Sequence, residues 1–205
     1  NTLTIEHGVF IPRPETEELA HQLTQQDGKP SGPVLDIGAG SGCLAIALAS
    51  AFPEVPVQAL ENSERALPVL RANIAQNDAS VQVIAGSILK PEALPVSLEP
   101  AFALIVSNPP YVTEQEQKQM AERITGHEPA EALYVPDADP LKYYRAIAHF
   151  AAAYLCGNGQ LALEVNAAYA QQVAGLLQQQ GFADVSVMPD LQGADRFVYA
   201  FQPNQ

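Results

Sequence analysis

Residues 34–42 read VLDIGAGSG: a short apolar run interrupted by one aspartate, then three glycines that alternate with small residues. The segment LAIALASAF (44–52) follows and is rich in the helix formers alanine and leucine. Alternating glycines between a strand and a helix let a ligand approach the backbone, where the amide groups of the helix start can face it. A tight turn alone requires fewer glycines, so we expect a ligand site here.

Alternating strand and helix signals continue along the rest of the chain. Strands are also expected at 55–61, 81–86, 101–107, 159–165, 185–189 and 196–201, and helices at 63–77, 140–155 and 168–180, after a lead-in and helix over 1–25. The run AFALIVS (101–107) is apolar throughout, as in a parallel strand covered on both faces. This order predicts one α/β domain over residues 1–205, with a mainly parallel seven-stranded sheet and helices on both faces.

Composition limits the classes of function. The chain has 205 residues and a formal net charge of −13, which argues against general binding of DNA or RNA through phosphates. A local basic groove or a basic protein partner remains compatible with this charge. No run approaches the roughly 20 apolar residues of a membrane span. The chain starts at Asn1 without a secretion signal, and we expect it to be a fragment of a longer protein.

Cysteine and histidine spacing gives no sign of a metal site. Cys43 and Cys156 belong to no CxxC pair, and the four histidines have no HxH or HxxxH spacing. We expect two buried free thiols, no metal and a cytoplasmic location.

The second ligand signal is Glu61, at the end of the strand that follows the glycine loop. A carboxylate there can accept hydrogen bonds from both hydroxyls of a ribose. The glycines are spaced GxGxG rather than GxGxxG, which makes a nicotinamide cofactor the weaker prediction. The glycine loop and Glu61 together resemble the first two motifs of class I S-adenosylmethionine-dependent methyltransferases.

The third signal is Asn108-Pro109-Pro110-Tyr111, which ends the apolar strand over 101–107. Proline after Asn108 keeps the chain extended, and the two prolines remove N–H donors. The Asn108 side-chain oxygen and the Pro109 carbonyl are then two acceptors for a planar –NH2 group, on which Tyr111 can stack. Such acceptors fix the plane of a poor nitrogen nucleophile and favour the charge that builds on it during attack. A strand-ending turn with a tyrosine lid is the simpler alternative.

The flanking segments resemble one family. NPPY is shared by methyltransferases that act on adenine N6, guanine N2 and glutamine amides. IPRPETEEL (11–19), HEPAEAL (127–133), LEVN (163–166) and DLQGADRFV (190–198) resemble, in the same order, segments of the HemK/PrmC family of protein-(glutamine-N5) methyltransferases. The resemblance implies a Rossmann-like class I methyltransferase fold. It also implies methyl transfer from S-adenosylmethionine to the glutamine of the Gly-Gly-Gln motif in class I peptide chain release factors.

Site roles follow from this resemblance residue by residue. It implies that the loop Gly38-Ala39-Gly40-Ser41-Gly42 lines the cofactor with Glu61, Ile88 and Asn108. It assigns the glutamine amide to Asn108 and Pro109, with Pro110 and Tyr111 completing the pocket. Two positions depart from the family: Ser87 stands where an Asp beside the adenine is usual, and Asn166 stands where Gly is usual.

The segment before the glycine loop allows two interpretations. Pro14 and Glu17 are suited to starting a helix, whereas the resemblance suggests that Arg13, Thr16 and Glu17 also cover the active site. Glu128 could order a substrate loop or merely lie in it. The family carries a small helical domain before IPRPETEEL, and the roughly 10 residues here are too few to form it.

Two alternatives differ in class from a glutamine methyltransferase. A nucleic-acid amino-methyltransferase would share the NPPY chemistry, but it calls for a basic cleft that this acidic chain does not suggest. A non-catalytic cofactor-binding module is compatible with Ser87 and Asn166, although the intact NPPY argues against it. We therefore expect a release factor as the protein partner, with no membrane and no direct nucleic-acid contact.

Overall fold

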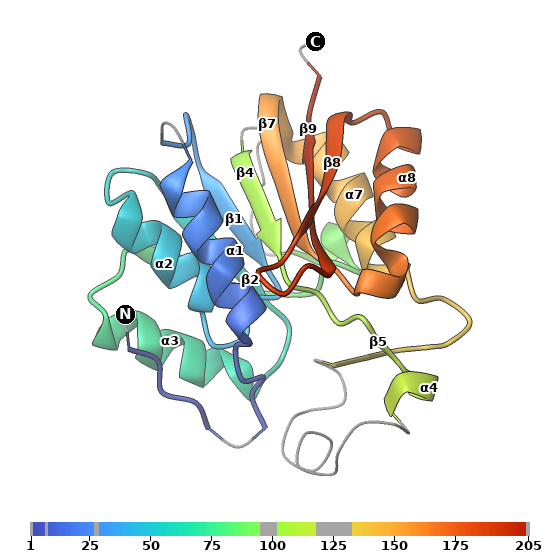
Figure 1. The fold of residues 1–205 in the computed structure, drawn as a ribbon. Helices are drawn as coiled ribbons and strands as arrows, with labels where there is room; N and C mark the ends of the chain where they lie inside the picture. The colour runs from blue at the N-terminus through green and yellow to red at the C-terminus, as the bar shows by residue number, and fades with distance from the viewer. Residues whose placement is uncertain (1, 7, 27–28, 95–101, 118–132, 204–205) are drawn as a thin grey trace.

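A computed structural model describes residues 2–6, 8–26, 29–94, 102–117 and 133–203. Seven strands form one sheet in the order β3-β2-β1-β4-β7-β9-β8, with helices on both sides (Figure 1). Neighbouring strands from β3 to β7 run parallel, and β9 pairs antiparallel with β7 and β8. The mainly parallel seven-stranded sheet expected from the sequence is confirmed. Glu128 lies outside the described residues.

The strand bounds follow the apolar runs of the sequence. The large sheet contains β1 (Val34–Ile37), β2 (Val57–Glu61), β3 (Val81–Ala85), β4 (Phe102–Ser107), β7 (Leu155–Glu164), β8 (Ala183–Pro189) and β9 (Asp195–Phe201). A separate pair, β5 (Val112–Thr113) and β6 (Tyr134–Val135), follows the NPPY segment.

The helices are α1 (Pro14–Gln25), α2 (Cys43–Ala51), α3 (Ala66–Gln76), α4 (Glu114–Gln117), α7 (Lys142–Tyr154) and α8 (Ala170–Gln179), with 3₁₀ turns η1 (Pro91–Ala93) and η2 (Ala167–Tyr169). The longer helices form two layers around the sheet, and the short α4 lies beside β5 and β6. Figure 1 shows α1, α2 and α3 on one side of the sheet and α7 and α8 on the other.

Strand β4 is covered on both faces, which explains its apolar sequence. Ile105 packs in one core cluster with residues of α7 and α8. Its neighbours Leu104 and Val106 pack in a second cluster with residues of α1 and α2. Because successive side chains point to opposite faces, both layers of helices are filled from the same strand. The NPPY segment is thus attached to one of the most buried strands of the sheet.

The start of α3 and the start of β7 each differ from the sequence prediction by more than two residues. The assigned α3 begins at Ala66, but Leu67 N–H already donates to the Ser63 carbonyl at 3.0 Å and Ala66 N–H donates to Ser63 Oγ at 3.3 Å, so Ser63 caps the first turn. Strand β7 begins at Leu155 rather than 159, with a register shift along its pairing with β4. Asn158 has a φ of 62° within this irregular stretch.

Within the described residues, no helix has the length and apolar character needed to cross a membrane. Cys43 and Cys156 are both free and partly buried. In the same ranges, no group of three or more His, Cys, Asp or Glu side chains is arranged to hold a metal ion.

Candidate active site

A cavity of about 490 Å³ lies at the carboxyl edge of the parallel strands. The volume is typical of small-molecule sites, and the loops after β1 and β4 flank the point where the strand order reverses. Nearly all residues predicted for the site line this cavity: Gly38, Ala39, Gly40, Ser41, Glu61, Ile88, Asn108, Pro109, Pro110 and Tyr111. The structure therefore gathers segments that are far apart in the sequence.

The glycine loop curls back onto the end of β2. Gly38 and Ala39 donate their N–H groups to the Leu60 carbonyl at 2.8 and 3.1 Å. Gly38 has a φ of +73°, and a Cβ added to it would meet nothing within 4 Å. That open space belongs to the cavity that Gly38 lines, so the missing side chain leaves room for a ligand against the backbone.

Gly42, the last predicted glycine of the loop, lies outside the cavity lining. It has a φ of +90° and precedes α2 as its N-terminal cap residue. A Cβ there would lie 2.7 Å from Leu70 Cδ1 and 3.0 Å from Ile46 Cδ1. The structure thus gives Gly42 a packing role between α2 and α3, which glycine spacing alone does not distinguish from ligand binding.

Glu61 is buried at the end of β2, with both carboxylate oxygens already oriented. Its Oε2 accepts a hydrogen bond from Gly40 N–H at 2.7 Å, and its Oε1 accepts one from Ser63 N–H at 2.6 Å. Each oxygen retains a second lone pair for an external donor. The carboxylate is therefore preorganised to accept hydrogen bonds from two neighbouring hydroxyls.

Asp36 is a cavity residue that the sequence prediction did not include among the binding groups. Its side chain is 1% exposed; Oδ2 accepts a hydrogen bond from Ala45 N–H at 3.0 Å, and Oδ1 is buried without a partner. Burial raises the pKa of Asp36 to about 7 and the charge of Glu61 adds to this, while the Ala45 hydrogen bond acts in the opposite direction. An unpaired buried oxygen beside a cavity is suited to a cationic group of a ligand.

The loop after β3 supplies an apolar wall. Ile88 is buried in the core beside α7 and also lines the cavity. Ser87 lines it too, and its hydroxyl accepts a hydrogen bond from Leu89 N–H at 3.3 Å. A flat apolar group can pack on Ile88 beside the Ser87 hydroxyl.

Asn108 follows β4 with its side-chain amide in a defined orientation. Its Nδ2 donates a hydrogen bond to Thr16 Oγ1 in the first turn of α1 at 2.9 Å. The Thr16 hydroxyl in turn donates to Glu164 Oε2 at 2.8 Å. A hydroxyl that gives its proton to a carboxylate can only accept from Asn108. This arrangement leaves Asn108 Oδ1 as an acceptor.

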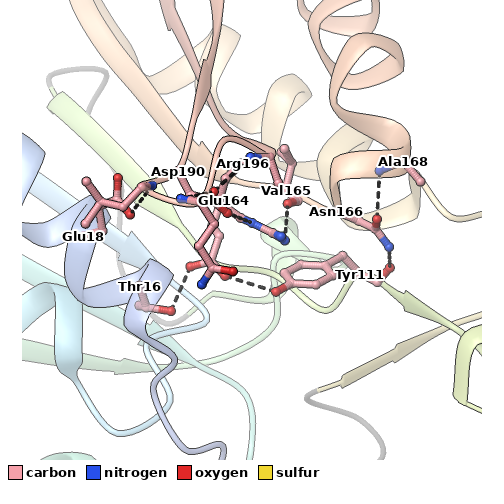
Figure 2. A network of polar contacts seen from close by, with 12 residues as sticks. Thr16, Glu18, Tyr111, Glu164, Val165, Asn166, Ala168, Asp190 and Arg196 are labelled. Atoms are coloured by element: carbon pink, nitrogen blue, oxygen red, sulfur yellow. Dashed lines mark hydrogen bonds and ion pairs between the residues drawn. The ribbon is translucent and has the colours of Figure 1, made fainter. Parts of the chain in front are cut away.

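Glu164, at the end of β7, is the buried centre of a polar network (Figure 2). It is fully buried, and its Oε1 accepts a hydrogen bond from Tyr111 Oη at 3.1 Å. Burial raises the pKa of Glu164 to about 7, whereas the Thr16 and Tyr111 hydrogen bonds and the charge of Arg196 lower it. Burial also raises the pKa of Tyr111 far above its ordinary value, so its hydroxyl stays a donor.

Asn166 holds the chain that follows NPPY in place through its side-chain hydrogen bonds. Its Nδ2 donates to Glu116 Oε1 at 3.0 Å and to the Tyr111 carbonyl at 3.4 Å. Its Oδ1 accepts a hydrogen bond from Ala168 N–H at 3.0 Å, which caps the 3₁₀ turn η2. A glycine at position 166 could form none of these side-chain contacts.

The DLQGADRFV ending packs beside α1 near the same network. Asp190 pairs with Arg196 at 3.2 Å, and Arg196 also donates to the Val165 carbonyl at 3.1 Å (Figure 2). Arg196 lines the cavity, as does Arg13 at the start of α1. The sequence alone predicted no role for Arg196 or Glu164. The single carboxylate in the otherwise apolar run LALEV (161–165) is the sequence feature that could have indicated a role for Glu164.

These residues fit S-adenosylmethionine. The unpaired oxygen of Asp36 suits an ammonium group, the Glu61 carboxylate suits ribose hydroxyls, and Ile88 offers an apolar surface to adenine. The open space at Gly38 allows close approach to the backbone.

Comparison with known sequences agrees with this geometry. The family of the Methyltransferase small domain matches residues 3–133. The release factor glutamine methyltransferase of Bacteroides thetaiotaomicron is 39% identical over 193 residues, which cover 94% of this chain and 68% of the relative. The release factor glutamine methyltransferase of Cereibacter sphaeroides is 40% identical over 192 residues, which cover 94% of this chain and 66% of the relative.

Solved structures share the fold. A methyltransferase from Pyrococcus furiosus superposes with a TM-score of 0.70 at 17% identity, over 98% of this chain and 88% of that one. The release factor-specific protein-(glutamine-N5) methyltransferase from Alicyclobacillus acidocaldarius gives a TM-score of 0.54 at 26% identity, over 94% of both chains. The expected class I S-adenosylmethionine-dependent methyltransferase fold is confirmed. The chain therefore belongs to the release factor glutamine methyltransferase family.

Proposed function

We propose that the protein transfers a methyl group from S-adenosylmethionine to the side-chain amide nitrogen, N5, of the glutamine in the Gly-Gly-Gln motif of class I peptide chain release factors. Its relatives are named as release factor glutamine methyltransferases, which supports this substrate. The observation that carries the proposal is the orientation of Asn108. Asn108 Nδ2 donates a hydrogen bond to Thr16 Oγ1. Its Oδ1 is therefore left to accept a hydrogen bond from an amide –NH2 group in the cavity.

The cofactor half of the site binds through three contacts. Glu61 would accept hydrogen bonds from the ribose hydroxyls, Asp36 would pair with the ammonium group, and Ile88 would pack on the adenine. When bound, S-adenosylmethionine supplies an electrophilic methyl group on a positively charged sulfur. The Gly38 turn allows this ligand to lie against the backbone.

The substrate half of the site orients the amide. Asn108 Oδ1 and the Pro109 carbonyl each accept one of the two N–H groups of the glutamine, and Tyr111 packs on its plane. This fixes the nitrogen with its lone pair toward the methyl group and stabilises the positive charge that builds on nitrogen. S-adenosylmethionine would supply the methyl group: the N–C bond would form as the S–C bond breaks, with S-adenosylhomocysteine as the leaving group. The methylated nitrogen would be strongly acidic and lose its proton to solvent, so no base is needed before attack.

The charge of the chain favours a protein substrate over a nucleic acid. The net charge is −13, whereas a nucleic-acid enzyme needs a basic surface for phosphates. Translation terminates in the cytoplasm, so we place the reaction there.

One labelling experiment separates these substrates. The protein is incubated with methyl-labelled S-adenosylmethionine and, in parallel, a release factor, its Gly-Gly-Gln→Gly-Gly-Ala variant, DNA and RNA. We expect label on the release factor alone, lost in the alanine variant. Label on DNA or RNA would reject the proposal, and so would equal labelling of both release factors.

A further inference from the structure

The Asn108 amide has two ends of nearly equal shape but opposite chemistry. Only Oδ1 can accept a hydrogen bond from the –NH2 of a glutamine, whereas Nδ2 would oppose it. A catalyst that uses Oδ1 therefore needs a neighbour that distinguishes the two ends. Thr16 Oγ1 is that neighbour, 2.9 Å from Asn108 Nδ2.

Thr16 alone does not determine the orientation, because a hydroxyl both donates and accepts. Its proton could point at Asn108 Oδ1 and favour the flipped amide. In the structure this proton is directed to Glu164 Oε2 at 2.8 Å. An ionised carboxylate only accepts, so Thr16 is left to accept from Asn108.

The second oxygen of Glu164 orients the neighbouring aromatic side chain. Oε1 accepts a hydrogen bond from Tyr111 Oη at 3.1 Å, on the ring that lines the substrate half of the cavity. Glu164 itself is fully buried and does not line the cavity. It therefore acts on transfer without touching the substrate, and the side chains that it contacts are the route that its hydrogen bonds provide.

We propose that Glu164 is a positioning residue that, through Thr16, directs Asn108 Oδ1 toward the substrate amide and, through Tyr111, holds the adjoining ring. This inference rests on the proposed function. The network joins α1, the loop after β4 and the end of β7 (Figure 2), so three separate elements converge on one carboxylate. Glutamine at position 164 mimics the protonated acid, because its amide can donate to Thr16 and release the Thr16 proton toward Asn108.

The charge state of Glu164 is set by groups from every element around it. Burial raises the pKa of Glu164 to about 7; the Thr16 and Tyr111 hydrogen bonds and the charge of Arg196 lower it, and Glu15 raises it. Tyr144 Oη donates to the Glu164 main-chain carbonyl at 3.3 Å, and Cys43 lies within electrostatic range. Transfer is therefore expected to fall as the pH drops and Glu164 takes up a proton.

The kinetic test compares four variants at saturating S-adenosylmethionine with a release factor as acceptor. Thr16→Val and Glu164→Gln should each lower kcat about ten- to a hundredfold, with the Kd of the cofactor changed less than about threefold. Thr16→Ser keeps the hydroxyl and should recover most of the loss, and Thr24→Val, on the same helix, is the control. Wild-type kcat in Thr16→Val, or the same loss in Thr16→Ser, would overturn the proposal.

A second test does not depend on the substrate. Nuclear magnetic resonance follows the side-chain –NH2 signals of Asn108, assigned by their loss in Asn108→Ala, as the pH is varied. These signals should shift with the titration of one carboxyl group in the wild type and in Asp36→Asn, but not in Glu164→Gln. The same titration in Glu164→Gln would contradict the proposal. A wild type that shows this titration but methylates no release factor would reject the proposed function and leave the positioning role standing.

Discussion

Asn108 Nδ2 donates a hydrogen bond to Thr16 Oγ1 at 2.9 Å, joining two residues that are 92 positions apart in the chain. The contact links the first turn of α1 to the NPPY segment after β4. It means that α1 is part of the active site and does more than cover one face of the sheet. It also leaves the acceptor oxygen of Asn108 for the substrate, which is the feature on which the proposed chemistry depends.

Glu61 should control cofactor affinity. In the wild type, Gly40 N–H and Ser63 N–H donate to the Glu61 carboxylate at 2.7 and 2.6 Å. Glu61→Gln places an –NH2 group against one of these N–H groups, so that two donors face each other. We expect the Kd for S-adenosylmethionine to rise about ten- to a hundredfold by calorimetry. Glu64→Gln, on the exposed surface nearby, is the matched control. Equal affinity in both variants would show that Glu61 does not bind the ribose.

Gly38 and Gly42 should respond differently to alanine. Both have positive φ, so either substitution strains the backbone by about 1 kcal/mol. Gly42→Ala also places a methyl group 2.7 Å from Leu70, and overpacking of this kind costs roughly 1–3 kcal/mol more. Denaturant unfolding should therefore show the larger loss of stability for Gly42→Ala, and calorimetry the larger loss of cofactor affinity for Gly38→Ala. The reverse ranking would contradict both assigned roles.

Asp36 should make the free protein less stable as the pH rises. Burial raises its pKa from 3.8 in the unfolded chain to about 7, so the folded state takes up a proton that the unfolded state has lost. This contribution to stability is complete below the unfolded pKa and disappears as the pH rises through the folded value.

Asp36→Asn removes this titration. We expect its melting temperature, measured without cofactor, to fall less than that of the wild type between about pH 4 and 8. Its affinity for S-adenosylmethionine should be lower, because the charge that pairs with the ammonium group is gone. If the melting temperatures of the two proteins changed equally with pH across this range, Asp36 would not titrate as the structure indicates.

Asn166 should stabilise the segment after NPPY through Glu116. Although burial acts in the opposite direction, hydrogen bonds from Thr113 and Asn166 lower the pKa of Glu116 below its ordinary 4.5. A lowered folded pKa stabilises the protein above the unfolded value, and this stability is lost as the pH falls through the folded value.

Asn166→Gly therefore tests the contribution of the Asn166 side chain. We expect a lower melting temperature than wild type at neutral pH, with a smaller difference in acid as Glu116 is protonated. Glu116→Gln should reproduce most of the pH-dependent part of this loss in melting temperature. If the difference in melting temperature between wild type and Asn166→Gly did not change with pH, a contribution of Glu116 would be excluded.

The sequence predicted the sheet and most of the cavity because those features are local. The apolar runs indicate strands, and parallel strands end at one edge, so the glycine loop, Glu61 and NPPY were expected to meet there. The roles of Gly42 and Glu164 depend on contacts between distant segments. Glycine spacing does not reveal that Leu70 and Ile46 crowd Gly42. Likewise, the run LALEV does not show that Thr16 and Tyr111 bond to its carboxylate.

The most direct test of the account is a single-turnover reaction of the protein with S-adenosylmethionine and a release factor, with the Gly-Gly-Gln peptide then analysed by mass spectrometry. The wild type should add one methyl group to the glutamine. Asn108→Ala should add none on the same timescale while its cofactor Kd stays within about tenfold, or ~1.4 kcal/mol. Methylation of that glutamine by Asn108→Ala at the wild-type rate would contradict the claim that Asn108 holds the reacting amide.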